Sequence, residues 1–197
     1  MKICTYSYEK YLDMAKAFHG YLAPGLLIGG FMVDLAMKHL PEGEFFDAIC
    51  ETPVCLPDAV QILTPCTFGN GWLSVVPFGK FALAFYEKSS GRGVRVHLDA
   101  AKLKSWPEIN DWFLKTKKKS EQNIERLLAQ IKEAGHGILS VQNVWVNPEK
   151  VRRQKLGPVA ICPLCHEAYP RNDGEMCRDC RGETPYRNLG AIQDTKR

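Results

Sequence analysis

The spacing of apolar positions predicts three helices in the first third of the chain. Over residues 5–19 these positions recur every three to four residues, which indicates an amphipathic helix that ends at Gly20. A second helix is expected over Pro24–Leu40, because proline in the first helical position sacrifices no hydrogen bond. Leu56–Leu63 has the same helical spacing, and it carries Pro57 in its first turn.

Runs rich in β-branched and aromatic residues predict the strands. A helical pattern at Pro107–Gly135 separates the last predicted strand from the others. Turns with glycine or proline separate the runs between residues 72 and 98, which favours an antiparallel meander. The predicted fold is therefore α+β, with helices packed on an antiparallel sheet. The predicted strands are Glu44–Thr52, Trp72–Val76, Lys80–Tyr86, Gly93–Leu98 and Ile138–Val146.

Three glycines leave one side of the second predicted helix without side chains. They are Gly25, Gly29 and Gly30. Each costs about 1 kcal/mol of helix stability relative to alanine. We expect the close approach of another backbone to compensate, from a neighbouring helix or from a second copy of the chain.

Charge is distributed unevenly along the 197 residues, of which 45% are hydrophobic. Residues 1–149 contain 16 basic and 16 acidic residues, whereas residues 150–197 contain 10 and 6 and so carry the net charge of +4. The basic connector Lys150–Lys155 predicts a domain boundary, with domains at 1–155 and 156–197. The local excess favours a polyanionic partner such as nucleic acid, or equally a solvated surface.

The N-terminus lacks the apolar core of a signal peptide. The most apolar run, Leu26–Met37, contains Asp34 and is too short to cross a bilayer. Eight cysteines without an export signal favour free thiols and bound metal over disulfides. We therefore expect a cytoplasmic protein with no membrane partner.

Two matched CxxC pairs near the C-terminus predict a metal site. Four thiolates can surround a zinc ion tetrahedrally and leave no open position, which is typical of a structural site. The tail of about 40 residues holds too little core to fold unaided, so metal binding should drive its folding. We predict a structural zinc ribbon with the ligands Cys162, Cys165, Cys177 and Cys180.

Two further cysteines flank the third predicted helix. Cys55 precedes the positive end of the helix dipole, which favours the thiolate, and Cys66 follows the helix. With His19 they would supply three ligands and leave an open position, the pattern of a reactive metal site. The pattern alone favours a structural role for these residues, as is expected for Cys50 within its strand, because a free cysteine is usually a small buried hydrophobic residue. Cys55 and Cys66 are the best candidates for catalysis.

Several ordered motifs over about residues 14–100 share their order and spacing with one known family. They are Phe18–Gly25, Glu51-Thr52 followed by Cys55, Cys66–Gly71, Gly79-Lys80 and Gly93–Val96. This pattern resembles the FmdE family, which takes its name from a component of the molybdenum/tungsten formylmethanofuran dehydrogenase. A C-terminal zinc ribbon is also common in that family.

The resemblance implies an α+β domain, an intertwined homodimer and a metal-capable site at His19, Cys55 and Cys66. The family's first motif commonly reads FHGHxCPG, whereas this chain has Tyr21 and Ala23 at the second histidine and the cysteine. Two potential ligands are absent, so we assign no catalysis. The resemblance further implies that the pocket is lined by Tyr21, Asp58, Gln61 and Asn70.

Two functions follow from these patterns. The first is a metal-binding, homodimeric accessory or ligand-binding protein linked to formylmethanofuran dehydrogenase-type metabolism, with that enzyme complex or a small ligand as partner. The alternative is a transcriptional or regulatory module whose basic ribbon contacts nucleic acid or protein. A ribbon that only supports the dimer is favoured over one that binds DNA. The sequence contains no phosphate-binding loop or dinucleotide fingerprint.

Overall fold

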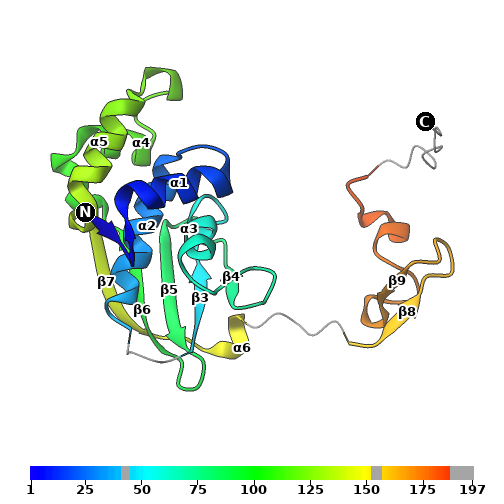
Figure 1. Ribbon diagram of the computed structural model, residues 1–197. Helices are drawn as coiled ribbons and strands as arrows, with labels where there is room; N and C mark the ends of the chain where they lie inside the picture. Colours follow the sequence, from blue (N-terminus) through cyan, green and yellow to red (C-terminus); the bar gives the residue numbers. More distant parts are fainter. Residues whose placement is uncertain (41–44, 152–156, 187–197) are drawn as a thin grey trace. The chain divides into compact units, whose positions relative to one another are not determined.

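The computed structural model describes residues 1–40, 45–151 and 157–186. The chain divides into two units, Met1–Arg153 and Gln154–Arg197, which we describe separately (Figure 1). The predicted boundary between residues 155 and 156 lies outside the described residues. None of the described helices combines the length and apolar character that a membrane span requires.

The first unit is built on a five-stranded sheet with the order β4-β3-β5-β6-β7. All neighbouring pairs are antiparallel except β3 and β4, which run parallel with Ala48 opposite Leu73. Each predicted strand overlaps one of the observed strands. These are β3 (Phe46–Cys50), β4 (Leu73–Val75), β5 (Ala82–Glu87), β6 (Arg92–Leu98) and β7 (Leu139–Trp145).

The predicted meander is wrong for its first strand. β4 pairs with β3 and not with β5, because β3 occupies the position between them. The connection from β3 to β4 contains α3 (Leu56–Leu63), and a helical crossover returns the chain parallel to the strand it left. This connection carries both Cys55 and Cys66.

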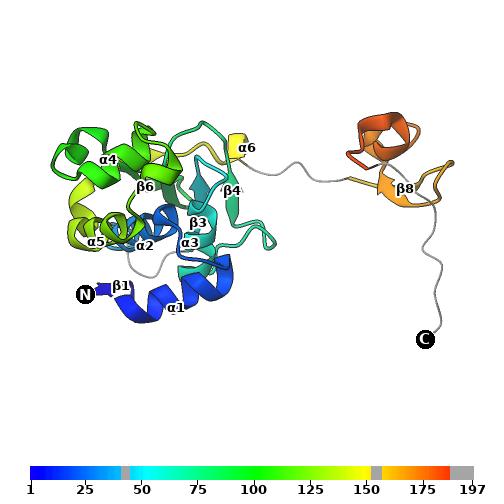
Figure 2. The same cartoon turned by 90° about the horizontal axis from the view of Figure 1, so that it is seen from above.

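Helices α1 (Tyr8–His19), α2 (Pro24–Met37) and α3 lie on one face of the sheet (Figures 1 and 2). α2 contacts β5 and β6 directly, and it also contacts α1 and α3. Most of its residues are buried, as expected for a helix that is apolar around its whole circumference. The main core therefore lies around α2.

The N-terminus forms a small hairpin of β1 (Lys2–Ile3) and β2 (Tyr6–Ser7) before α1 begins. The Ser7 hydroxyl caps α1 by accepting a hydrogen bond from the Lys10 amide at 3.1 Å. The first residues of the helix predicted over 5–19 are therefore in the hairpin. The helix ends as predicted at Gly20, whose φ of 88° is in the left-handed region.

A buried carboxylate ties this hairpin to α2. Asp34 is 3% exposed, and its oxygens lie 2.7 Å from the Cys4 amide, the Lys38 ammonium and His136 Nε2. Burial alone would raise the pKa of Asp34, but these contacts lower it to about 2. The carboxylate therefore stays charged and links three segments of the chain.

The helical stretch predicted at Pro107–Gly135 is divided into two helices. Lys115, with φ 56°, ends α4 in a left-handed conformation, and Asn123 caps α5 through the Arg126 amide. The lysine-rich segment between them forms only a short turn. The elements of this region are η1 (Ala100–Ser105), α4 (Pro107–Leu114), η2 (Lys119–Glu121), α5 (Ile124–Ala134), η3 (Gly135–Ile138) and, after β7, α6 (Pro148–Val151).

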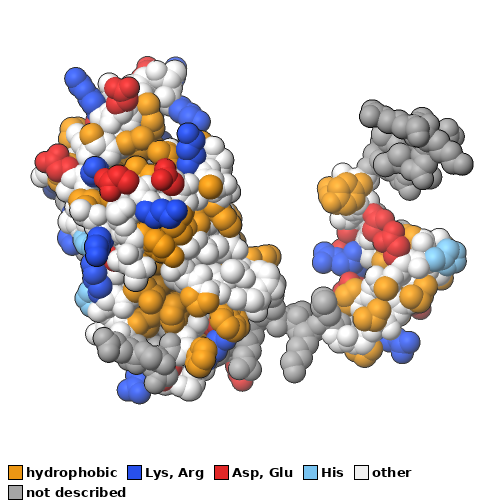
Figure 3. All heavy atoms as spheres, viewed as in Figure 1, with side chains coloured by type: hydrophobic (Ala, Val, Ile, Leu, Met, Phe, Trp, Pro, Cys, Tyr) orange, Lys and Arg blue, Asp and Glu red, His pale blue; other side chains and the backbone are white. Residues whose placement is uncertain are grey.

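Charged side chains of both signs are interspersed on the face of the first unit seen in Figure 3. This distribution agrees with the 16 basic and 16 acidic residues of positions 1–149. It is typical of a solvated surface rather than of a polyanion-binding face.

The second unit contains a hairpin of β8 (Val159–Ile161) and β9 (Ala168–Pro170). Two short helical turns follow, η4 (Arg171–Asp173) and η5 (Asp179–Glu183). Its buried apolar cluster consists of Cys162, Tyr169 and Cys177, with a few partly buried neighbours. Such a small cluster cannot offset the entropy of ordering the chain without a bound metal.

The glycines of α2 allow neighbouring elements to pack closely against this helix, as expected from the sequence. A Cβ on Gly29 would lie 2.8 Å from the Ala59 Cβ in α3, and one on Gly30 would lie 2.5 Å from the Tyr11 ring in α1. A Cβ on Gly25 would lie 3.2 Å from the Cys55 Cβ. The neighbours are thus elements of the same chain.

We expect Gly30→Ala to lower the free energy of unfolding by about 1–2 kcal/mol, as measured by denaturant titration. The Tyr11 ring cannot retreat, because it is fully buried and its hydroxyl donates to the Leu26 carbonyl at 2.6 Å. Overpacking therefore outweighs the gain of about 1 kcal/mol in helix propensity. The control is Gly137→Ala, where a Cβ meets nothing within 4 Å. A Gly30→Ala protein more stable than the parent would contradict this packing.

Candidate functional site

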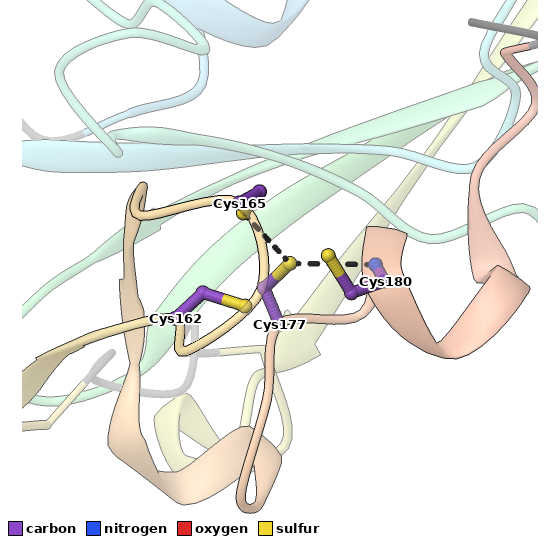
Figure 4. A group of neighbouring side chains, drawn as sticks. All are labelled: Cys162, Cys165, Cys177 and Cys180. Atoms are coloured by element: carbon purple, nitrogen blue, oxygen red, sulfur yellow. Dashed lines mark hydrogen bonds between the residues drawn. The ribbon is translucent and has the colours of Figure 1, made fainter.

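The four C-terminal cysteines converge on one point in the second unit (Figure 4). Their sulfur atoms all lie within 4.8 Å of one another. Cys162 follows β8 and Cys165 lies in the turn of the hairpin, while Cys177 and Cys180 come at the start of the helical turn η5. The Cys165 and Cys177 sulfurs are 3.7 Å apart.

This geometry fits a zinc ion. Zn–S bonds of about 2.3 Å in a tetrahedron separate neighbouring sulfurs by about 3.8 Å, close to the observed 3.7 Å. Backbone amides of Cys165 and Cys177 lower the pKa of the Cys162 thiol to about 6. The neighbouring sulfurs, Cys177 first, raise the pKa of Cys180 instead, so a cation is needed before all four can ionise. Four thiolates complete the coordination shell, so the site is structural.

In the first unit, the end of α1 meets the start of α3. His19 Nδ1 lies 2.6 Å from Asp58 Oδ2, and the two side chains are 17% and 30% exposed. A carboxylate in this position holds the proton on Nδ1 and leaves the Nε2 lone pair free for a ligand. The Tyr21 ring lies beside the imidazole, with centroids 5.0 Å apart, and is 61% exposed.

Cys55 is the N-cap residue of α3 and has a strained backbone. Its φ of 59° is in the left-handed region, which costs a non-glycine residue about 1–3 kcal/mol. Burial raises the pKa of its thiol, and the Asp58 carboxylate raises it further. These effects oppose the thiolate that the helix N-terminus is expected to favour. A bound cation would reverse this balance.

Cys66 faces the interior. It is fully buried, and its thiol donates to the Phe46 carbonyl at 3.5 Å. Burial raises the pKa of this thiol to about 11. Cys50 is also fully buried in β3, as predicted for a core residue.

The structure does not bring His19, Cys55 and Cys66 together as a ready-made ligand set. Within residues 1–40, 45–151 and 157–186, the four C-terminal cysteines alone form a group of three or more metal-type ligands with all ligand atoms within 4.8 Å of one another. The second metal site therefore stays a prediction. The observed pairing joins His19 to Asp58 instead.

Gln61 and Asn70, predicted as pocket residues, organise the loop after α3. The Asn70 side-chain oxygen accepts from the Thr67 and Trp72 amides, and its nitrogen donates to the Pro65 carbonyl at 2.7 Å. Gln61 accepts a hydrogen bond from the Phe68 amide at 3.1 Å. Neither residue lines the cavity beside Cys55.

A cavity of about 330 Å³ opens beside Cys55. Gly25 and Thr52 line it together with the aromatic residues Phe81, Trp112 and Phe113. Lys80 and Lys115 also contribute to its lining. Sequence reasoning missed the aromatic residues and Lys115. The adjacent aromatic residues Trp112 and Phe113 could have indicated a binding surface. Their helix is far from Cys55 in sequence, so the pattern could not show that they line the same cavity.

Comparison with protein-family models gives two matches. Residues 18–145 match the FmdE model, described as FmdE, molybdenum formylmethanofuran dehydrogenase operon. Residues 153–187 match the FmdE treble clef zinc finger. The second description refines the predicted ribbon, because a treble clef combines a hairpin knuckle with ligands at the start of a helical segment, as Cys177 and Cys180 are here.

One curated relative and one solved structure extend this likeness. A probable S-adenosyl-L-methionine-binding protein of Archaeoglobus fulgidus is 31% identical over 189 residues, covering 85% of this chain. The chain spans 51% of that relative's length. The crystal structure of a tungsten formylmethanofuran dehydrogenase FmdE-like protein from Syntrophus aciditrophicus is 57% identical, with a TM-score of 0.86. The match covers 94% of this chain and 97% of that one.

Removing zinc with a strong chelator is expected to abolish amide protection in β8 and β9, while β5 and β6 keep theirs. The finger has little apolar core of its own, whereas the sheet does not depend on this metal. Hydrogen exchange followed by mass spectrometry measures both units at once. Cys177→Ser should reproduce the chelator effect, and Cys4→Ser serves as its control. Equal loss of protection in β5 would contradict the independent stability of the two units.

Proposed function

The chain belongs to the FmdE family, and from this membership we propose a homodimeric accessory or ligand-binding protein of molybdenum/tungsten formylmethanofuran dehydrogenase-type metabolism. The FmdE-like protein from Syntrophus aciditrophicus supports this link, because its description relates it to a component of that enzyme type. The zinc finger makes the chain a metal-binding protein whatever its partner is. Its partner is the dehydrogenase complex or a small ligand.

The single observation that carries the metal-binding part of the proposal is the His19–Asp58 pair, in which Asp58 lies three residues after Cys55. In metal sites, a ligating histidine commonly donates its second ring nitrogen to a carboxylate, as the 2.6 Å contact allows here. His19 Nε2 and the Cys55 sulfur are then the ligands, and Asp58 is a positioning residue. Cys66 joins them only if its thiol leaves the Phe46 carbonyl. Bound metal would act as a Lewis acid toward a ligand in the open positions.

A binding role is better supported than turnover. Tyr21 and Ala23 offer no good metal ligand at the positions where the FmdE pattern has histidine and cysteine. The protonated thiols of Cys55 and Cys66 are weak nucleophiles. We therefore assign no reaction to the site. None of the eight cysteines, all of which are described, forms a disulfide, and this agrees with the reducing cytoplasm that we propose as its location.

The name of the Archaeoglobus fulgidus relative supports the binding of a small molecule. S-adenosyl-L-methionine is a small molecule with an aromatic adenine ring, and this chain spans only 51% of the relative that is named for it. We take from that name the proposal that the shared part binds a small molecule. The cavity beside Cys55 has a suitable size for one.

The regulatory alternative has less support. Two arginines of the finger, Arg178 and Arg181, lie 2.6 and 3.0 Å from the Glu183 carboxylate. This pairing reduces the positive charge that the finger offers to a nucleic acid. The basic residues at 152–155 and 187–197 lie outside the described residues.

Metal analysis of the whole chain is expected to find one zinc in the finger and one further metal in residues 1–155. His19→Ala or Cys55→Ser should each remove the second metal and retain the first, because each deletes one ligand. Cys50→Ser is the matched control, since Cys50 is buried in β3. Inductively coupled plasma mass spectrometry on freshly purified protein gives the ratio. One metal per chain, unchanged in His19→Ala and Cys55→Ser, would refute the second site.

Sedimentation at micromolar concentration is expected to give twice the 22.2 kDa mass of one chain. The homodimer follows from the family resemblance, and closed twofold assemblies are the commonest oligomers of soluble proteins. A single 22.2 kDa species over the whole concentration range would exclude a stable dimer.

A further inference from the structure

Three aromatic residues, Phe81, Trp112 and Phe113, line the cavity beside Cys55, which opens to solvent. The Phe81 ring meets Trp112 and Phe113 edge-on, with centroid distances of 6.3 and 6.4 Å. All three side chains are only partly buried, although they pack against the main core. Partly exposed aromatic faces of this kind provide a stacking surface for a planar ring.

Two lysines give the cavity a positive charge. Lys80 follows Gly79 in the turn before β5, and Lys115 follows the last residue of α4. Among the described residues, neither ammonium group is paired with a carboxylate. Both lysine side chains are exposed, so each ammonium group is free to turn toward a ligand. No Asp or Glu is among the described residues that line the cavity, so the cavity lacks an internal anion.

Backbone strain also gathers at this cavity. Four non-glycine residues in the described part of the chain have a positive φ, and two of them, Cys55 and Lys115, line the cavity. They come from elements separated by 60 positions in the sequence. At Lys115 this conformation ends α4, whereas the start of α3 does not require it at Cys55. Strain of the kind at Cys55 persists where the surrounding structure imposes it, often where a ligand is clamped.

We propose that this cavity binds a small planar aromatic molecule that carries one anionic group, either a carboxylate or a phosphate. The ring packs among Phe81, Trp112 and Phe113, and because Phe81 stands at 85° to Trp112 it stacks on one of these rings and meets the other edge-on. The anion lies between the ammonium groups of Lys80 and Lys115. The volume of about 330 Å³ is near the lower end of the ~300–1,000 Å³ range of ligand pockets, so one or two fused rings fit. The inference rests on the proposed ligand-binding function and needs no metal.

The charges decide against a cationic ligand. An aromatic surface alone would attract a cation through its ring faces. Two unpaired lysines repel such a cation and favour an anion, with which an ammonium forms a charge-assisted hydrogen bond. A neutral aromatic molecule would gain the stacking but leave both ammonium groups unpaired.

Calorimetric titration of the full-length protein with four probes tests both requirements. The probes 2-naphthoate and 2-naphthyl phosphate have the ring and the anion, 2-naphthalenemethanol has only the ring, and cyclohexanecarboxylate has only the anion. We expect one or both aromatic anions to bind at least tenfold more tightly than the other two. The tighter of the two identifies carboxylate or phosphate. Equal affinity for 2-naphthalenemethanol, or no binding of either aromatic anion at millimolar concentration, would overturn the proposal.

Variants assign the binding to this cavity. Lys80→Gln and Lys115→Gln should each weaken the tighter probe about tenfold, the effect of losing one charged hydrogen bond. Lys104→Gln is the control, because Lys104 is an exposed lysine outside the cavity. Trp112→Leu should weaken both aromatic anions and remove any quenching of tryptophan fluorescence by them. Unchanged affinity in both cavity lysine variants would refute the assignment, even if Trp112→Leu fails to fold.

The same titration separates this inference from the metal site. In His19→Ala, where the second metal is expected to be lost, probe binding should persist, because no probe contact uses His19. Loss of the metal together with retained probe binding supports both proposals. A second metal in the parent protein without any probe binding would refute the ligand and leave the metal site standing. Probe binding by a parent protein that lacks a second metal would refute the metal site and leave the ligand standing.

Discussion

The close packing of α2 against α1 and α3 is the constraint on which the first unit depends. Gly29 and Gly30 leave no room for a side chain, so Ala59 and the Tyr11 ring lie against the α2 backbone. This contact fixes the two outer helices relative to each other. It thereby brings His19, at the end of α1, within 2.6 Å of Asp58 in the first turn of α3. Helix packing therefore determines where the two paired side chains of the candidate site lie.

The second unit depends on a different force. Its buried apolar cluster includes two of the zinc ligands, so metal coordination and core formation are the same event. The first unit has a continuous apolar core that surrounds α2. The chain therefore combines one domain stabilised by burial of apolar surface with one stabilised by four metal–sulfur bonds.

Local signals made much of the fold predictable. Prolines at the starts of α2 and α3, Gly20 after α1 and the paired CxxC motifs act through neighbouring residues, so their effects are visible in the sequence. The parallel pairing of β4 depends on which strand occupies the sheet centre, and no local pattern encodes that choice. The inward direction of Cys66 and the approach of Trp112 to Cys55 likewise arise from tertiary packing.

The excursion between β6 and β7, residues 99–138, forms one wall of the cavity and so couples ligand binding to its own local stability. It contains α4 and α5, which contact each other, and it is anchored at both ends by the register of β6 with β7. A segment of this kind can open as a cooperative substructure while the sheet stays folded. A ligand that contacts both this segment and Phe81 stabilises the closed form of the segment, so it would slow hydrogen exchange throughout α4 and α5, far beyond the residues that it touches.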